Sequence, residues 1–223
     1  MTNDQLQLDV TAEMSWEPKV DSAAIMVSAD RGTITLRGTV GSLREKREAK
    51  KAAERVHGVT AVNDELQVRA PGKDRRDDTE LCGDVLHALI LDGLIPTTVG
   101  ARVRDGLVTL TGTTSWHYQR EEAEFVAANV PGVLGIDDQI KLITSPTASG
   151  IKTPAGSGIT NAIRGAFARS ARLDPGRLSV SASSGTVTVS GTVRSWAERD
   201  EAIAAAWAVP GVTEVHDRIN VEY

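Results

Sequence analysis

The chain has a single cysteine, Cys82, and its four histidines follow no metal-binding spacing. One thiol excludes an intramolecular disulfide and a cysteine-rich zinc site. No apolar stretch approaches the roughly 18 residues that a membrane-spanning helix needs. Nucleophile elbows, phosphate-binding loops and dinucleotide fingerprints are absent as well. We therefore expect a protein that is not an enzyme and has no cofactor, no bound metal and no small-molecule substrate.

The start of the chain lacks the basic residues, apolar run and cleavage site of a secretory signal. We expect a cytoplasmic protein, peripheral at the membrane if it binds lipid; a leader removed before this start would place it in the envelope instead. The 25 basic and 30 acidic residues give a net charge of −5. A basic excess is typical of nucleic-acid binders, so no nucleic-acid partner is expected.

One 35-residue pattern occurs three times without insertion or deletion, at residues 34–68, 108–142 and 187–221. Such a repeat indicates an array of similar small domains. Most of the constant positions are small or core residues, which specify a fold and supply no chemistry. The constant polar positions include a glutamate and an aspartate in each copy: Glu48, Glu122 and Glu201; Asp64, Asp138 and Asp217.

Before each block, apolar residues at every fourth position predict a helix that packs on a sheet. These residues are Leu6, Val10 and Met14; Leu81, Val85 and Leu89; and Ile159, Ile163 and Phe167. Polar residues suited to cap the three helices are Asn3 or Asp4, Asp78 or Thr79, and Ser157. The expected order begins with a helix in every copy.

Each predicted helix is followed by two segments of alternating polarity, which indicate a β-hairpin with one buried face. Glycine in the intervening turn supplies the positive φ of a tight hairpin, at Gly32, Gly106 and Gly185. A second helix is then expected to run to Val56, Val130 or Val209, with inward alanines at helical spacing. A last strand follows the glycine after this helix. The order α-β-β-α-β is thus predicted for every copy.

These residues resemble the BON domain, a bacterial module of this length and element order. The first-helix stripe, the hairpin glycine, the V-T-L-x-G-T-V segment and the V-x-G-V ending carry the resemblance. It implies an α+β fold with three domains at residues 2–70, 77–145 and 155–223, each a three-stranded sheet packed against two helices. It also implies a stress-related binding module, because BON proteins are associated with osmotic stress, phospholipids and, in one branch, potassium.

The segments between the copies differ in composition. Residues 70–77 are short and charged, whereas residues 144–156 are rich in Ser, Thr, Gly and Pro. Such composition predicts a flexible second linker, so the third domain is expected to move more freely than the first two.

The second helix of the first copy has a basic stripe, which consists of Arg44, Arg47, Lys51 and Arg55. Steps of three and four residues place these cations on one helix face. The stripe is either an ordinary solvated face, neutralised by nearby glutamates, or a docking surface for anionic phospholipid. The other copies lack it, so lipid contact would depend on the first domain.

Two tryptophans and the constant aspartate have alternative interpretations. Trp207 occupies a position that is Ala128 and Glu54 in the other copies, which favours an interface between domains over a partner or lipid contact or local packing. Trp16 is expected in the core or at a helix cap. The constant aspartate accepts backbone N–H groups or, alternatively, forms part of a cation site.

The sequence therefore predicts a binding protein for an anionic membrane surface. A protein-interaction scaffold or folding helper, with exposed strand edges or Trp207 as the contact, is the first alternative. A potassium-binding sensor is the second alternative.

Overall fold

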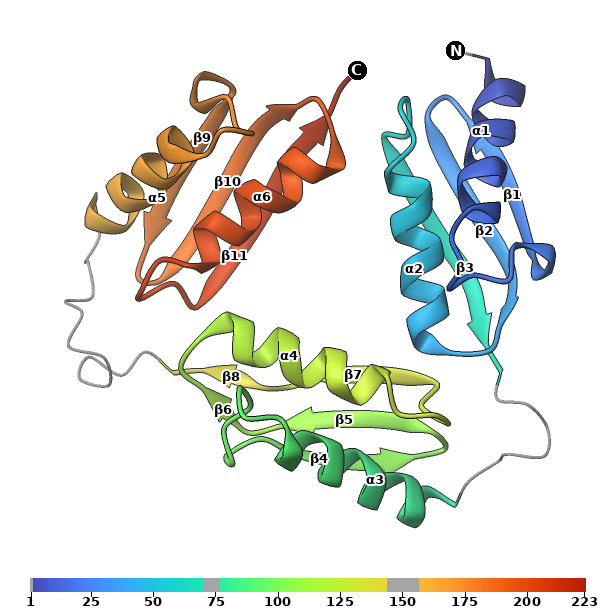
Figure 1. Ribbon diagram of the computed structural model, residues 1–223. Helices are drawn as coiled ribbons and strands as arrows, with labels where there is room; N and C mark the ends of the chain where they lie inside the picture. The colour runs from blue at the N-terminus through green and yellow to red at the C-terminus, as the bar shows by residue number, and fades with distance from the viewer. Residues whose placement is uncertain (1, 70–76, 144–156) are drawn as a thin grey trace. The chain divides into compact units, whose positions relative to one another are not determined.

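The computed structural model describes residues 2–69, 77–143 and 157–223, which form three units of the same element order (Figure 1). The linkers predicted at residues 70–77 and 144–156 lie outside the described residues, apart from Asp77. Each unit is described by itself below.

The first unit consists of two helices, a 3₁₀ turn and one three-stranded sheet. Its elements are α1 (Asn3–Ser15), η1 (Ser22–Ala24), β1 (Ile25–Asp30), β2 (Thr33–Val40), α2 (Leu43–Glu54) and β3 (Ala61–Val68). The central strand β2 pairs antiparallel with β1 and parallel with β3. Helix α2 therefore connects two parallel strands, as parallel pairing requires a crossover.

The second and third units repeat this arrangement. The second contains α3 (Asp78–Leu91), β4 (Gly100–Arg104), β5 (Leu107–Thr111), β6 (Thr113–Thr114), α4 (His117–Ala128), β7 (Gly135–Asp138) and β8 (Lys141–Leu142). The third contains α5 (Ser157–Arg169), η2 (Pro175–Arg177), β9 (Leu178–Ser183), β10 (Thr186–Val193), α6 (Trp196–Trp207) and β11 (Glu214–Val221). The predicted α+β class and element order are confirmed. In the second unit, however, the sheet is divided into three-stranded and two-stranded parts.

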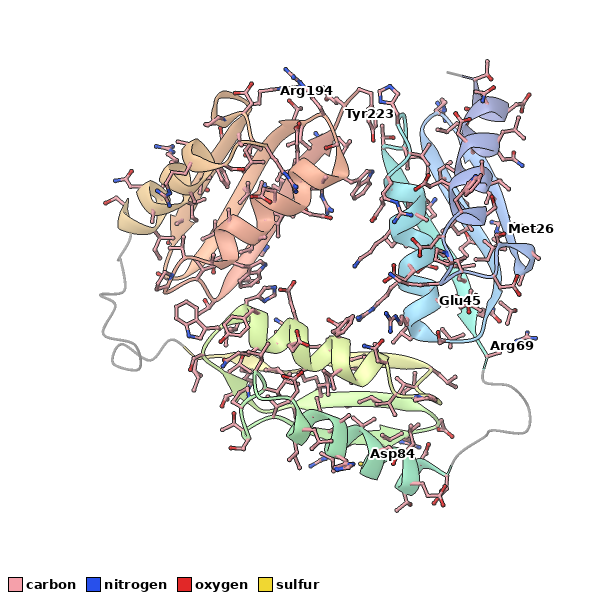
Figure 2. All side chains as sticks on the ribbon, viewed as in Figure 1. Met26, Glu45, Arg69, Asp84, Arg194 and Tyr223 are labelled. Atoms are coloured by element: carbon pink, nitrogen blue, oxygen red, sulfur yellow. The ribbon has the colours of Figure 1, made fainter. Side chains whose placement is uncertain are left out.

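Both helices of each unit pack on the same face of its sheet (Figure 1). In the first unit Ile34 and Leu36 point toward the helices and are fully buried. The predicted first-helix stripes and inward alanines are buried in all three units. The opposite face has no helix of its own unit: Met26, one residue beyond the inward Ile25, is 71% exposed (Figure 2). Successive side chains of a strand point to opposite faces of the sheet, so every second residue of these strands belongs to the core.

A two-residue turn closes the hairpin of the first unit. Arg31 and Gly32 have φ values of 47° and 82°, and Asp30 pairs directly with Thr33. Positive φ at both central residues is the conformation of a type I′ turn, whose twist matches that of the strands. The sequence predicted the glycine, but not that the residue before it also has a positive φ.

The constant glycine at the end of β2 is required by a close backbone approach. A Cβ built on Gly38 would lie 2.1 Å from the carbonyl oxygen of Ala24, and Gly38 has a φ of 143°. A Cβ built on Gly112 or Gly191 would lie at the same distance from Thr98 O or Arg177 O. No side chain fits at this point, where the chain just before the first strand lies against the central strand.

The predicted helix caps are partly wrong. Thr2, not Asn3 or Asp4, caps α1 by accepting the N–H of Gln5. Asn3 Oδ1 instead accepts the N–H of Arg31 in the hairpin turn at 2.9 Å. In the second unit Asp78 likewise accepts the N–H groups of Asp105 and Gly106. These side chains tie the first helix to the hairpin, a contact that local sequence does not show.

The second helix of each unit ends two residues earlier than predicted, at Glu54, Ala128 and Trp207. The N–H of Val56 bonds to Ala53 O rather than to the carbonyl four residues back. The chain therefore tightens into a 3₁₀-type turn before Gly58, which has a φ of 93°. For Trp16 the cap prediction is confirmed and the core alternative is wrong, because this residue is the C-cap of α1 and is 84% exposed.

Candidate functional site

The basic stripe lies on the solvent side of α2. Ser42 caps this helix by accepting the N–H of Glu45, whose carboxylate accepts the N–H of Gly41 in return. Buried alanines occupy the sheet-facing side: Ala49, Ala52 and Ala53. Arg44, Lys51 and Arg55 are exposed on the other side, at steps of seven and four residues that correspond to about two turns and one turn. Arg47 lies on the flank of this row and is partly exposed.

The cations of the stripe differ in how far they are neutralised. Arg55 forms ion pairs with Glu13 at 2.8 Å and with Glu17 at 3.1 Å. The hydrogen bond from Arg55 to Glu13 raises the pKa of the guanidinium above its ordinary value. Arg44 and Lys51 form no ion pair with any residue that the structure describes. The positive charge available to an external anion is therefore centred on these two residues.

The neighbouring lysines of α2 have acidic partners in the first unit. Lys46 is directed to the sheet, where its ammonium group lies 3.4 Å from Asp64 and donates to Leu66 O at 2.6 Å. Lys50 lies 3.8 Å from Glu54 on the same helix. Helical periodicity places both lysines beside the basic stripe, but it does not show that Lys46 points to the sheet whereas Lys50 is exposed.

A basic residue faces the constant aspartate in every unit. Arg120 pairs with Asp138, and Arg199 pairs with Asp217, at the repeat position that Lys46 occupies in the first unit. Each aspartate also accepts the backbone N–H two residues later, at 2.9 to 3.0 Å. The sequence contains the signal, because this helix position is basic in all three copies, but the periodicity of the basic stripe does not single it out.

This arrangement bears on the predicted cation site at the aspartate. One of its oxygens accepts an N–H group and the carboxylate already has a positively charged partner, so an added cation would meet electrostatic competition. Within the described ranges, no group of three or more His, Cys, Asp or Glu side chains is placed to hold a metal ion. The aspartate therefore has a structural role in each unit.

A second exposed surface lies at the end of α3, and the sequence analysis did not predict it. Three aliphatic side chains within five residues form this apolar cluster: Ile90 and Leu91 are each 73% exposed, and Leu94 is 53% exposed. They lie outside the buried stripe of Leu81, Val85 and Leu89. The sequence signal for this cluster is that Ile90, Leu91 and Leu94 are apolar although they fall outside the four-residue spacing of the buried stripe.

Trp207 is the last residue of α6. It is partly buried and packs against the core of its own unit. Its predicted role in an interface between domains stays a prediction.

The part of the chain that the structure describes contains no helix that is both long and apolar enough to cross a bilayer.

Comparison with known proteins identifies related sequences. The sequence model of the BON domain family matches residues 2–70, 77–144 and 156–223. The osmotically-inducible protein Y of Escherichia coli (strain K12) is 32% identical over 146 residues, which cover 63% of this chain and 73% of that protein.

Two solved structures of CdsD, a structural protein of the type III secretion system of Chlamydia trachomatis, also match at 14% identity. One match covers 96% of this chain and 91% of that chain with a TM-score of 0.25. The other, to the C-terminal domain of CdsD, covers all of both chains with a TM-score of 0.27. Scores this low establish no shared arrangement.

Proposed function

The chain belongs to the BON domain family, and from this we propose that it is a non-enzymatic, stress-related binding protein that associates with anionic phospholipid surfaces. The relative named as osmotically inducible supports the stress-related part of the proposal. We propose that contact occurs from the aqueous side of the membrane, through α2 of the first domain.

The exposure of Arg44 and Lys51 is the observation that carries the phospholipid proposal. Both side chains extend from the helix face opposite the buried alanines, without an ion pair in the described parts of the chain. Arg55 continues the row of exposed cations, but it forms ion pairs with Glu13 and Glu17. An anionic headgroup can therefore approach Arg44 and Lys51 without first displacing an internal partner.

The expected strength is modest. Each Lys or Arg near an anionic membrane contributes about 1 kcal/mol, so Arg44 and Lys51, the two cations without an ion pair in the described residues, contribute about 2 kcal/mol. This energy corresponds to roughly a thirtyfold increase in partitioning over a neutral surface. Because the cations remain hydrated, physiological salt is expected to remove much of the effect.

Flotation with anionic and with neutral vesicles, at low and at physiological salt, tests the proposal. The double variant Arg44→Gln/Lys51→Gln removes the two free charges from α2. The matched control Arg31→Asn/Arg37→Gln removes two charges from the hairpin turn and the open sheet face of the same domain, where both arginines are exposed.

We expect salt-sensitive binding to anionic vesicles that falls at least tenfold in the α2 variant and less than twofold in the control. Equal losses in the two variants would show a diffuse charge effect without a site on α2. Absence of binding by the native chain at low salt would refute the phospholipid proposal.

A folding helper or protein-binding module is the second candidate function, and the apolar cluster on α3 favours it. Exposed aliphatic groups that lie close together are typical of surfaces that bind a partner. On this hypothesis Ile90, Leu91 and Leu94 contact an apolar segment of another polypeptide.

Suppression of aggregation by the native chain, with a chemically denatured model protein as the client, tests this second function. The variant Leu91→Ser/Leu94→Ser is expected to lose the suppression, whereas Arg44→Gln/Lys51→Gln keeps it. If neither the native chain nor the α2 variant suppresses aggregation, the folding-helper hypothesis fails.

A further inference from the structure

The third domain has two arginines that the other domains lack at the same structural positions. Arg177 occupies the repeat position of Ala24 and Thr98. This equivalence is structural, because in each domain a Cβ built on the constant glycine would lie 2.1 Å from the carbonyl oxygen of this residue. Arg194 likewise takes the place of Ser115 and Gly41. The third domain therefore gains two guanidinium groups where its relatives within the chain have small residues.

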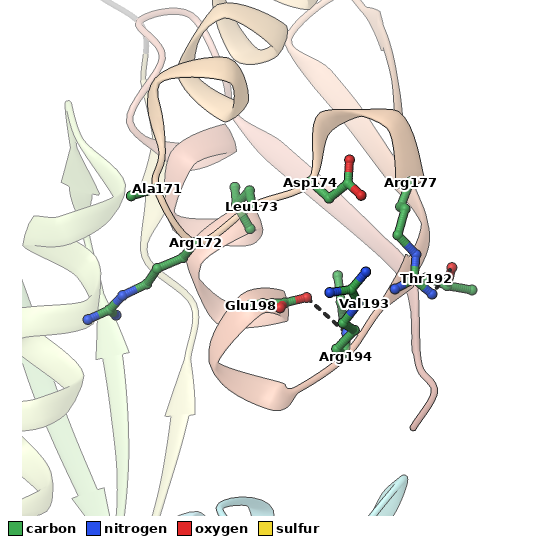
Figure 3. A pocket seen from close by; sticks show the side chains of 9 residues that line it. All are labelled: Ala171, Arg172, Leu173, Asp174, Arg177, Thr192, Val193, Arg194 and Glu198. Atoms are coloured by element: carbon green, nitrogen blue, oxygen red, sulfur yellow. Dashed lines mark hydrogen bonds between the residues drawn. The ribbon is translucent and has the colours of Figure 1, made fainter.

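Both arginines line a pocket of about 210 Å³ within the third domain (Figure 3). The pocket lies between the loop that precedes β9 and the junction of β10 with α6. Asp174 and Glu198 also contribute to its wall, and so does Arg172, which points away from the other charged side chains in Figure 3. We call this site the arginine pocket.

The two acidic side chains of the arginine pocket already accept backbone hydrogen bonds. Asp174 Oδ1 accepts the N–H of Gly176 at 3.0 Å, and Glu198 Oε2 accepts the N–H of Arg194 at 2.9 Å. These bonds fix the loop before β9 and the start of α6, where Ser195 is the N-cap. The carboxylates therefore have structural partners other than the guanidinium groups.

The guanidinium groups retain unused donors. Arg177 is partly buried and donates from Nη2 to Thr192 Oγ1 at 3.2 Å, and the side chain of Arg194 is exposed. Neither Arg177 nor Arg194 forms an ion pair with the residues that the structure describes. A guanidinium carries five N–H donors, so most of the donors at this site lack a protein acceptor.

We propose that the arginine pocket binds a phosphate group, with Arg177 and Arg194 as its main contacts. Guanidinium groups pair with phosphate through two parallel charge-assisted hydrogen bonds. The two arginines come from different elements, so their donors reach an anion from two directions. A tetrahedral phosphate presents oxygens in more than one plane and can accept from both, whereas a planar carboxylate matches a single guanidinium.

Two sources share this chemistry: a small phosphate compound and the phosphomonoester headgroup of a phospholipid. Amide NMR titrations of the full chain at constant ionic strength distinguish them. One arm uses inorganic phosphate, a second uses glycerol phosphate, and a third compares phosphatidic acid vesicles with phosphatidylcholine vesicles. The signals to follow are the amides of Thr192, Arg194 and Ser195.

The variants Arg177→Thr and Arg194→Ser introduce the residues that the second domain has at these positions, so the backbone is expected to accept them. The matched control is Arg164→Ser, which removes an exposed charge from α5 outside the pocket. We expect saturable shifts in the millimolar range, at least tenfold weaker affinity in each pocket variant and less than twofold change in the control.

Binding to both soluble compounds would assign the site to small phosphates, and binding to phosphatidic acid vesicles alone would assign it to a headgroup. The proposal is overturned if no arm shifts these amides, or if the pocket variants bind as tightly as the control. The site is in the third domain, so its failure leaves the phospholipid proposal for α2 of the first domain intact.

Discussion

Lys46 Nζ lies 3.4 Å from Oδ1 of Asp64, the same oxygen that accepts the N–H of Leu66. This arrangement ties α2 to β3 through one carboxylate. Both side chains are largely buried, with 26% and 21% of their surfaces exposed, so solvent screens the pair less than an exposed one. Its recurrence in the other two domains accounts for the constancy of the aspartate without a ligand.

Removal of the Asp64 carboxylate is expected to destabilise the first domain. Asp64→Ala leaves the N–H of Leu66 without its acceptor and removes the anionic partner of Lys46, whose ammonium keeps only the bond to Leu66 O, at a cost of about 2 kcal/mol. Asp64→Asn retains an acceptor for the N–H and costs about 1 kcal/mol. Urea unfolding, followed through amide signals of the first domain, measures both values. Asn63→Ala on the open sheet face is the control, and an equal loss there would contradict the role of Asp64.

The ion pair between Arg37 and Glu65 predicts a local pH effect. The hydrogen bond from Arg37 Nε, 2.6 Å long, lowers the pKa of Glu65 below its ordinary value of 4.5. The folded state therefore favours the carboxylate. The resulting stabilisation is present above pH 4.5 and is lost as the pH falls through the lower pKa of the folded state.

Carboxyl NMR titration is expected to show that Arg37→Gln moves the pKa of Glu65 back toward 4.5. Arg31→Asn removes a charge from the nearby turn and serves as the control. If Arg37→Gln leaves the pKa unchanged, the hydrogen bond is not its cause.

Two glycines of the second domain are expected to respond in opposite directions to alanine. A Cβ on Gly112 would lie 2.1 Å from Thr98 O at a φ of 122°, whereas a Cβ on Gly83 in α3 meets nothing within 4 Å. Gly112→Ala should cost more than about 3 kcal/mol. Gly83→Ala should stabilise the domain by about 0.5 to 1 kcal/mol, because alanine favours the helix. Thermal unfolding of the two variants tests this contrast, which a stable Gly112→Ala protein would refute.

Neighbouring leucines of α3 test the exposure of the apolar cluster. Leu89 is 2% exposed and Leu91 is 73% exposed. Leu89→Ala is expected to destabilise the second domain by about 3 kcal/mol, and Leu91→Ala by less than about 0.5 kcal/mol. Denaturant unfolding measures both. A large loss for Leu91→Ala would mean that the folded protein covers this side chain, which would remove the basis for its role in partner binding.

The repeated pattern predicted much of each domain. The four-residue spacing of Leu6, Val10 and Met14 predicted a buried helix face, and alternation predicted the strands on which it packs. These predictions succeeded because helix and strand periodicities depend only on neighbours in the sequence. The helix caps failed where Asn3 and Asp78 bond instead to a hairpin about 28 residues away.

The sequence by itself determined the element order, the buried faces and the turn glycines, since each follows from local geometry. Its repeated motifs carried the resemblance to the BON family. Only the tertiary structure decided which cations face solvent. Lys46 and Arg44 are two residues apart on α2, yet one reaches Asp64 and the other remains exposed. The arginine pocket also depends on the tertiary structure, because Arg177 and Arg194 come to line one cavity only after β9 and β10 pair. The contacts of long side chains depend on which elements pack nearby in the folded domain, and sequence separation does not specify them.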